Sequence, residues 1–89
     1  MTNSPDDMQK KAVALHYDHE HAPYVTAKGQ GEVARRIIEK AREHDIPIEE
    51  DPLLTQALSH IPLDEEIPEE LYKAVAAVLR YIMKTRGSV

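Results

Sequence analysis

The sequence contains no cysteine, phenylalanine or tryptophan, and tyrosine is its only aromatic residue. Without cysteine the chain can form neither a disulfide nor a thiolate metal site, and a cysteine nucleophile is excluded. No apolar run approaches the roughly 18 residues that a membrane span requires. Residues 1–11 are polar and lack the apolar stretch of a secretion signal. We therefore expect a cytoplasmic location.

The charge balance argues against polyanionic partners. The net charge is -5 and the pI is near 5.4. An acidic surface repels a phosphate backbone, and anionic membranes are disfavoured for the same reason. A length of 89 residues leaves room for one domain with a thin core.

The first third of the chain predicts two short strands after a polar tail. Residues 1–11 carry too little apolar material to fold and are expected to form a flexible tail. Apolar residues occupy both alternating sets over 12–17, which indicates a strand covered on both faces. A second strand is expected over 24–27, and Lys28–Gly31 is expected to turn tightly into a helix.

Three helices and a third strand follow in the prediction. An amphipathic stripe from Val33 to Ala41 predicts a helix that ends before Ile46-Pro47. Residues 46–49 are expected to form a strand, which would complete a right-handed βαβ unit. Asp51-Pro52 is typical of a helix start, and a last helix is expected from Glu69 to about Thr85. The fold class is therefore α+β, with a small mixed three-stranded sheet packed by three helices, in a single domain over 12–86.

The last helix is more apolar than a surface helix needs to be. Two adjacent stripes give it an apolar arc of roughly 200° at about 100° per residue. The first stripe holds Leu71, Val75, Val78 and Ile82, and the second holds Tyr72, Ala76, Leu79 and Met83. The extra width indicates either a helix buried deep in the domain or an exposed patch that binds a partner.

Four segments in close order carry a resemblance to a known family. They are AVALHYD at 12–18, AP-Y-V-TAKGQGE at 22–32, IPIEEDPLLTQAL at 46–58 and IPEELYKAVAAVLRYI at 67–82. Together they resemble the C-terminal cytoplasmic domain of the FlhB/YscU/SpaS family (with EscU and HrcU), which controls substrate choice in flagellar and type III export.

The resemblance implies a self-cleaving Asn-Pro-Thr-His loop directly before the strand at 12–17. Residues 7–11 read Asp-Met-Gln-Lys-Lys instead, so self-cleavage does not carry over. The chain looks like a free-standing copy of the fragment downstream of that cut. The family's upstream strand is not recognisable in 1–11, so one sheet edge is expected to be open to strand addition.

We accordingly expect a non-catalytic binding domain without a cofactor, accessory or regulatory in flagellar or type III export. The resemblance implies an apolar partner site at Ala22 and Pro23, on the first loop, with Ala76 and Leu79, on the last helix. Expected partners are export-apparatus proteins, an FlhB-type paralogue or export substrates, met at the export gate. A degenerate paralogue without a present role is a further possibility.

The alternative is a small metal-binding or enzymatic domain that uses the loop from His16 to His21. His16, Asp18, His19 and His21 offer metal-ligand chemistry, although the spacing fixes no complete site. Three weaker motifs are better explained structurally. Lys28–Gly31 could bind an anion, the acidic runs 49–51 and 64–66 could act as acid and base, and Ser59-His60 could form a nucleophile pair. We expect a turn, solvated surface and a loop at these positions instead.

Overall fold

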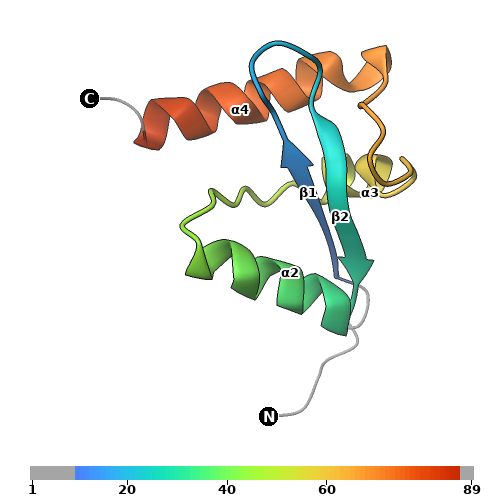
Figure 1. Ribbon diagram of the computed structural model, residues 1–89, viewed down its shortest axis with the longest axis vertical. Helices are drawn as coiled ribbons and strands as arrows, with labels where there is room; N and C mark the ends of the chain where they lie inside the picture. Colours follow the sequence, from blue (N-terminus) through green and yellow to red (C-terminus); the bar gives the residue numbers. More distant parts are fainter. Residues whose placement is uncertain (1–9, 87–89) are drawn as a thin grey trace.

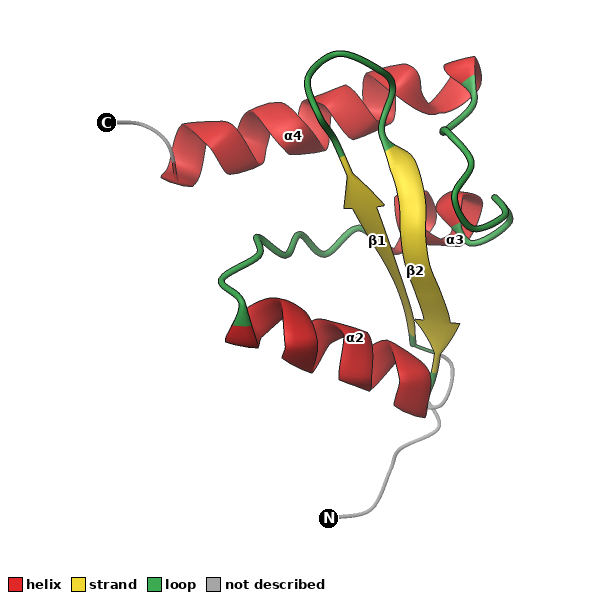
Figure 2. Cartoon of the chain, in the orientation of Figure 1, coloured by secondary structure: helices red, strands yellow, loops and turns green. Residues whose placement is uncertain are grey.

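The computed structural model describes residues 10–86 and has an antiparallel hairpin at its centre. Strands β1 (Lys11–His16) and β2 (Tyr24–Gln30) pair along their lengths, joined by a loop over 17–23. The register shifts between Ala14 and Leu15, where Thr26 is the extra residue and its hydroxyl donates to the Ala14 carbonyl at 3.3 Å. Figures 1 and 2 show the hairpin running between α2 at one end and α4 at the other.

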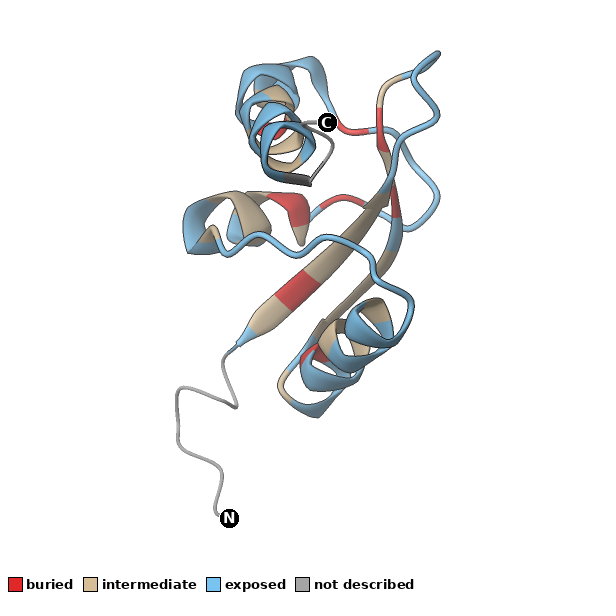
Figure 3. Ribbon diagram, turned by 90° about the vertical axis from the view of Figure 1, so that its left-hand side faces the viewer, coloured by how far each residue is buried: buried red, intermediate tan, exposed pale blue. Residues whose placement is uncertain are grey.

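Helices cover both faces of the hairpin, as the side-chain pattern of β1 predicts. Helix α2 (Glu32–Glu43) lies on one face, while α3 (Pro52–Leu58) and α4 (Tyr72–Arg86) lie on the other (Figure 3). Val13 and Leu15 pack against the core, and Ala12, on the alternate face of the strand, is buried as well. The two-sided strand follows directly from this arrangement.

The three predicted helices are confirmed. Asp51 caps α3, since its Oδ1 accepts a hydrogen bond from the Leu54 backbone N–H at 3.1 Å. The last helix begins with the short 3-10 turn η1 (Glu69–Leu71), which leads into α4. Gly31, with a φ of 61°, starts α2 in a backbone region that glycine tolerates best.

The main core lies where the hairpin, α3 and α4 meet. Side chains from all three elements and from the connection between α3 and α4 gather there, and buried residues concentrate at that junction in Figure 3. The buried cluster consists of Val25, Leu58, Ile61, Ile67 and Val75. Helix α4 contributes Val75, from its first half, to this small core. The apolar surface of the helix continues past the core.

The prediction of a mixed three-stranded sheet is wrong. Within residues 10–86 the sheet has 2 strands, both antiparallel, so there is no βαβ crossover. The expected third strand at 46–49 is an extended segment without strand pairing, and Ile46 and Ile48 are exposed there. Pro47 lacks an N–H donor, and the Ile46 N–H donates instead to the Ala41 carbonyl at the end of α2, at 2.8 Å.

Residues 64–67 take the place beside β2 that the third strand was expected to fill. Val25 donates to the Glu65 carbonyl at 3.0 Å, and Asp64 donates back to the Val25 carbonyl at 2.7 Å. An isolated bridge joins Tyr24 to Glu66. In the part of the chain that the structure describes, no strand pairs with the outer edge of β1, and strand addition there stays a prediction.

The expected tight turn at Lys28–Gly31 is also wrong, because β2 continues to Gln30 and only Gly31 turns the chain. Gly29 lies in the strand under the start of α2, where an added Cβ would come within 2.8 Å of the Val33 Cβ. Among residues 10–86 no helix is long and apolar enough to cross a membrane. The predicted tail at 1–11 falls mostly outside the described residues, although Lys11 already belongs to β1.

Candidate partner-binding pocket

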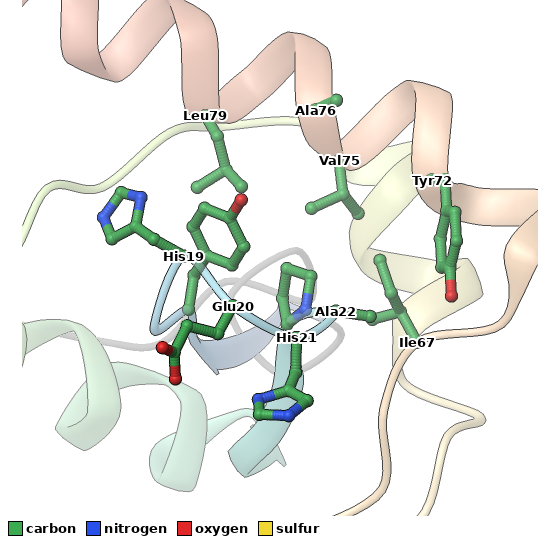
Figure 4. A pocket seen from close by; sticks show the side chains of 11 residues that line it. His19, Glu20, His21, Ala22, Ile67, Tyr72, Val75, Ala76 and Leu79 are labelled. Atoms are coloured by element: carbon green, nitrogen blue, oxygen red, sulfur yellow. The ribbon is translucent and has the colours of Figure 1, made fainter.

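A pocket of about 350 Å³ lies between the β1–β2 loop and α4. The loop contributes one wall and the helix contributes the other, while Ile67 comes from the segment that precedes η1 (Figure 4). The lining residues are Tyr17, His19, Glu20, His21, Ala22, Pro23, Ile67, Tyr72, Val75, Ala76 and Leu79. Two segments about 50 residues apart in the chain thus form one concave surface.

The structure brings together the four residues that the family resemblance singled out. Ala22 and Pro23 line the pocket from the loop, and Ala76 and Leu79 line it from α4. Pro23 is buried and the other three are half-buried, so their apolar surface is partly open to solvent. Their proximity makes a single binding surface possible, while their role in binding stays a prediction.

The floor of the pocket is part of the protein core. Val75 is 2% exposed and Ile67 is 3% exposed, and both belong to the buried cluster. In Figure 4, Val75 and Leu79 point from the helix toward the loop. The polar ends of Glu20 and His21 point away from the helix. The pocket therefore has an apolar interior and a polar outer rim, and its floor is held in place by core packing.

Several lining residues were not predicted as site residues. Tyr72 follows from the second apolar stripe of the helix, because Tyr72, Ala76 and Leu79 share one face. Ile67, Tyr17 and Glu20 carry no such signal in the sequence, and His19 and His21 are predicted there only as metal ligands, not as part of an apolar pocket. Their position depends on how the loop folds back over the helix, which periodicity does not report.

Asp18 organises the loop through local hydrogen bonds. Its Oδ1 accepts from the backbone N–H groups of Glu20 and His21, each at 2.9 Å. Its Oδ2 lies 3.2 Å from the His21 Nδ1. These contacts, led by the two backbone donors, hold the pKa of Asp18 far below its ordinary value of 3.8. The carboxylate thereby fixes the turn that carries Ala22 and Pro23 to the pocket.

The predicted metal-ligand set is not the one that the structure assembles. Within residues 10–86, Asp18, Glu20 and His21 offer ligand atoms within 4.8 Å of one another, and all three are exposed. His16 instead lies beside the Tyr24 ring, with centroids 5.3 Å apart, and His19 lies against Tyr17 at 4.6 Å. His19 is therefore not part of this cluster, and exposed acidic groups such as these are common on protein surfaces without a metal.

Two other motifs have structural roles. The Lys28 ammonium donates to the Ser59 carbonyl at 3.2 Å and to the Ile61 carbonyl at 2.7 Å, so it is not directed at an anion. The Ser59 hydroxyl donates to the Gln56 carbonyl at 2.7 Å, as expected at a helix end. Neither residue is arranged for the chemistry considered for it.

The chain is similar to known proteins over most of its length. YlqH, an uncharacterized protein of Bacillus subtilis, is 45% identical over 82 residues, covering 90% of this chain and 88% of its own length. The flagellar biosynthetic protein FlhB of Bacillus subtilis is 41% identical over 81 residues, covering 88% of this chain. The chain spans only 22% of that FlhB.

Solved structures give the same result. The cytoplasmic domain of FlhB from Shewanella putrefaciens superposes with a TM-score of 0.81 at 45% identity, over 85% of this chain and 64% of that one. The PscU C-terminal domain superposes with a TM-score of 0.75 at 32% identity, over 80% and 94% of the two chains. A model of the FlhB HrpN YscU SpaS family matches residues 9–82. The chain belongs to this family, and it corresponds to the C-terminal cytoplasmic domain of its members.

Proposed function

We propose that the chain is a non-catalytic protein-binding domain in flagellar or related type III export. Its pocket between the β1–β2 loop and α4 binds an apolar segment of an export substrate or of an export-apparatus protein, in the cytoplasm at the export gate. The observation that carries this proposal is the convergence of Ala22, Pro23, Ala76 and Leu79 on one apolar hollow.

The dimensions and polarity of the pocket favour a peptide segment over a small charged substrate. A volume of about 350 Å³ lies at the lower end of the range for ligand sites. Its interior is apolar, and the floor at Val75 and Ile67 is fixed by the core. One or two apolar side chains of an exported protein would displace water there and gain the corresponding transfer energy.

The amino-acid sequence supports the absence of self-cleavage in this proposal. Asn3 is the only asparagine, and Ser4, rather than proline, follows it. The positions directly before β1 hold Asp7 to Lys11, so the asparagine side chain that would attack its own carbonyl is missing. The domain would act by binding alone, whether it serves in substrate recognition, in switching or beside an FlhB-type paralogue.

Neighbouring residues of α4 provide a matched test. Ala76→Gln adds a larger side chain to the pocket, whereas Ala77→Gln adds the same atoms at a position that does not line it. Affinity purification of both variants and wild type from the source cell, followed by quantification of export components, would compare them. We expect Ala76→Gln to reduce the recovery of some export components at least about tenfold. Ala77→Gln is expected to leave the recovery of those same components unchanged.

Leu79→Asp is the second variant in the same experiment. A carboxylate at this half-buried position would remove apolar contact from the pocket, so we expect recovery to fall in the same way. Circular dichroism of each purified variant establishes that the fold persists. Recovery of export components by folded Ala76→Gln and Leu79→Asp at the wild-type level would refute the proposed site.

A further inference from the structure

A second groove lies on another side of α4, where the extended segment before α3 passes the helix. It has a volume of about 290 Å³ and is lined by Glu49, Asp51, Ala74, Ala77, Val78 and Tyr81. None of these residues belongs to the first pocket. Ala76 and Ala77 are consecutive, and a rotation of about 100° per residue places them on different sides of the helix.

The floor of this groove is apolar and uncovered by the described chain. Ala74 and Ala77 are exposed, and the Tyr81 side chain is 55% exposed. Small side chains at these two positions let another backbone approach α4 closely. A helix packing along α4 would cover this face, place small apolar side chains in the groove and bring one of its edges next to Glu49 and Asp51.

The two sides of the groove differ in charge. Glu49 and Asp51 line the groove and give it an acidic wall, in which Asp51 also accepts the Leu54 N–H through its Oδ1. Glu50, between them in the chain, is an exposed carboxylate as well. On the outer side of α4, Lys73 precedes Ala77 by one turn and Lys84 follows Tyr81 by nearly one turn. A partner that carries positive charge along one edge only would therefore bind in a defined orientation.

We propose that this second groove binds an amphipathic α-helix of another protein, with a small-residue apolar face and Lys or Arg along the edge that meets Glu49–Asp51. A second copy of this chain fits less well, because each copy carries a net charge of -5 and two copies repel each other. The site is independent of the proposed export-peptide pocket, and either proposal can fail without the other.

The test uses a synthetic helical peptide as the probe, with alanine and leucine on one face and lysine along one edge. Its twin carries glutamate at the lysine positions. Each is titrated into the 15N-labelled full chain, and backbone amide shifts are followed by NMR. We expect the lysine peptide to shift the amides of Ala74, Ala77 and Tyr81, to leave His21 and Ala22 in place, and to bind more weakly as salt is raised.

Three variants make the result specific. Ala77→Gln should weaken the lysine peptide at least about tenfold by filling the groove. Glu49→Gln should weaken it about threefold through lost charge, since the carboxylate is exposed. Ala76→Gln, the matched control on the first pocket, should bind it like wild type.

Several results would overturn the proposal. It fails if neither peptide binds at millimolar concentration, if the glutamate twin binds as tightly as the lysine peptide, or if the shifts centre on Ala22. Sedimentation equilibrium tests whether a second copy of this chain occupies the groove. A wild-type dimer that Ala77→Gln converts to monomer would assign this face to a second copy and contradict the partner proposed here.

Discussion

The two sides of α4 differ in what lies opposite them. On one side the β1–β2 loop closes over Tyr72, Ala76 and Leu79 to form the first pocket. On the other side Glu49 and Asp51 form an acidic wall beside Ala74, Ala77 and Tyr81. Both surfaces exist because the helix is more apolar than its small core requires, so one buried strip at Val75 leaves apolar residues on either side of it.

The two opposing walls are also held differently. The loop is fixed by the Asp18 turn at one end and by the pairing of Val25 with Glu65 just after Pro23. On the other side, Asp51 is held by the Leu54 N–H, whereas residues 46–50, which lead to it and include Glu49, are exposed throughout. The loop is therefore the more fixed of the two walls, and at the acidic wall charge contributes to the choice of partner.

Val75→Asp is expected to have the largest effect, because it removes the strip that supports both sides. Val75 is 2% exposed, and an unpaired carboxylate there should lower the free energy of unfolding by about 3 kcal/mol or more. Urea unfolding followed by circular dichroism measures the loss. Val75→Ala keeps an apolar residue and should cost less. A Val75→Asp variant as stable as wild type would contradict the assigned core.

Lys28→Met should cause the next largest loss of stability. The ammonium donates to the Ser59 and Ile61 carbonyls, and its removal leaves part-buried acceptors without these partners. We expect a loss of about 1 to 3 kcal/mol in the free energy of unfolding. Lys40→Met, on the exposed face of α2, is the control and should change stability little. Equal stability of the two variants would show that the Lys28 contacts contribute nothing.

Two substitutions of Asp51 distinguish its effect on stability from the effect of its charge at the second groove. Asp51→Ala removes the cap of α3 and should cost about 1 kcal/mol in urea unfolding. Asp51→Asn keeps a capping oxygen but not the charge, so it should retain stability and still weaken the lysine peptide. If Asp51→Ala is as stable as wild type, the cap has no energetic role.

Asp18 should produce the smallest effect, confined to the first pocket. Because its folded-state pKa is depressed, its contribution is present above the ordinary value of 3.8 and is lost as pH falls below it toward the folded-state pKa. We expect the protection of the Glu20 and His21 amides, relative to their intrinsic exchange rates, to fall below about pH 4 while that of Ala77 changes less. Asp18→Asn should show reduced protection of these amides already at neutral pH. Unchanged exchange in that variant would exclude a role for the turn.

Local pattern predicted the helices well and the sheet only in part. The stripe of α2, the Asp51-Pro52 start of α3 and the apolar arc of α4 follow from helical periodicity and capping, which are properties of neighbouring residues. The third strand failed for a tertiary reason. Residues 64–67, which read as an acidic loop, occupy the edge of β2, and Pro47 cannot donate to a sheet.

The residues of the candidate pocket were also predicted only in part. Tyr72, Ala76 and Leu79 share a helix face that spacing alone reveals, and Ala22 and Pro23 came from the family resemblance. The walls at Tyr17 to His21 and at Glu49 depend on where two connecting segments pass α4. Side-chain and backbone contacts between distant segments set those paths, and periodicity carries no information on them.

Site-specific photo-crosslinking from the two exposed tyrosines of α4 tests the central claim most directly. Tyr72 lines the first pocket and Tyr81 lines the second groove, so a photoreactive phenylalanine at either position samples one side only. In the source cell, the account predicts a cross-link from Tyr72 to an export substrate or export-apparatus protein, lost when Ala76→Gln is added, and a different product from Tyr81. Absence of any export component from the Tyr72 products, or the same product from both positions, would contradict it.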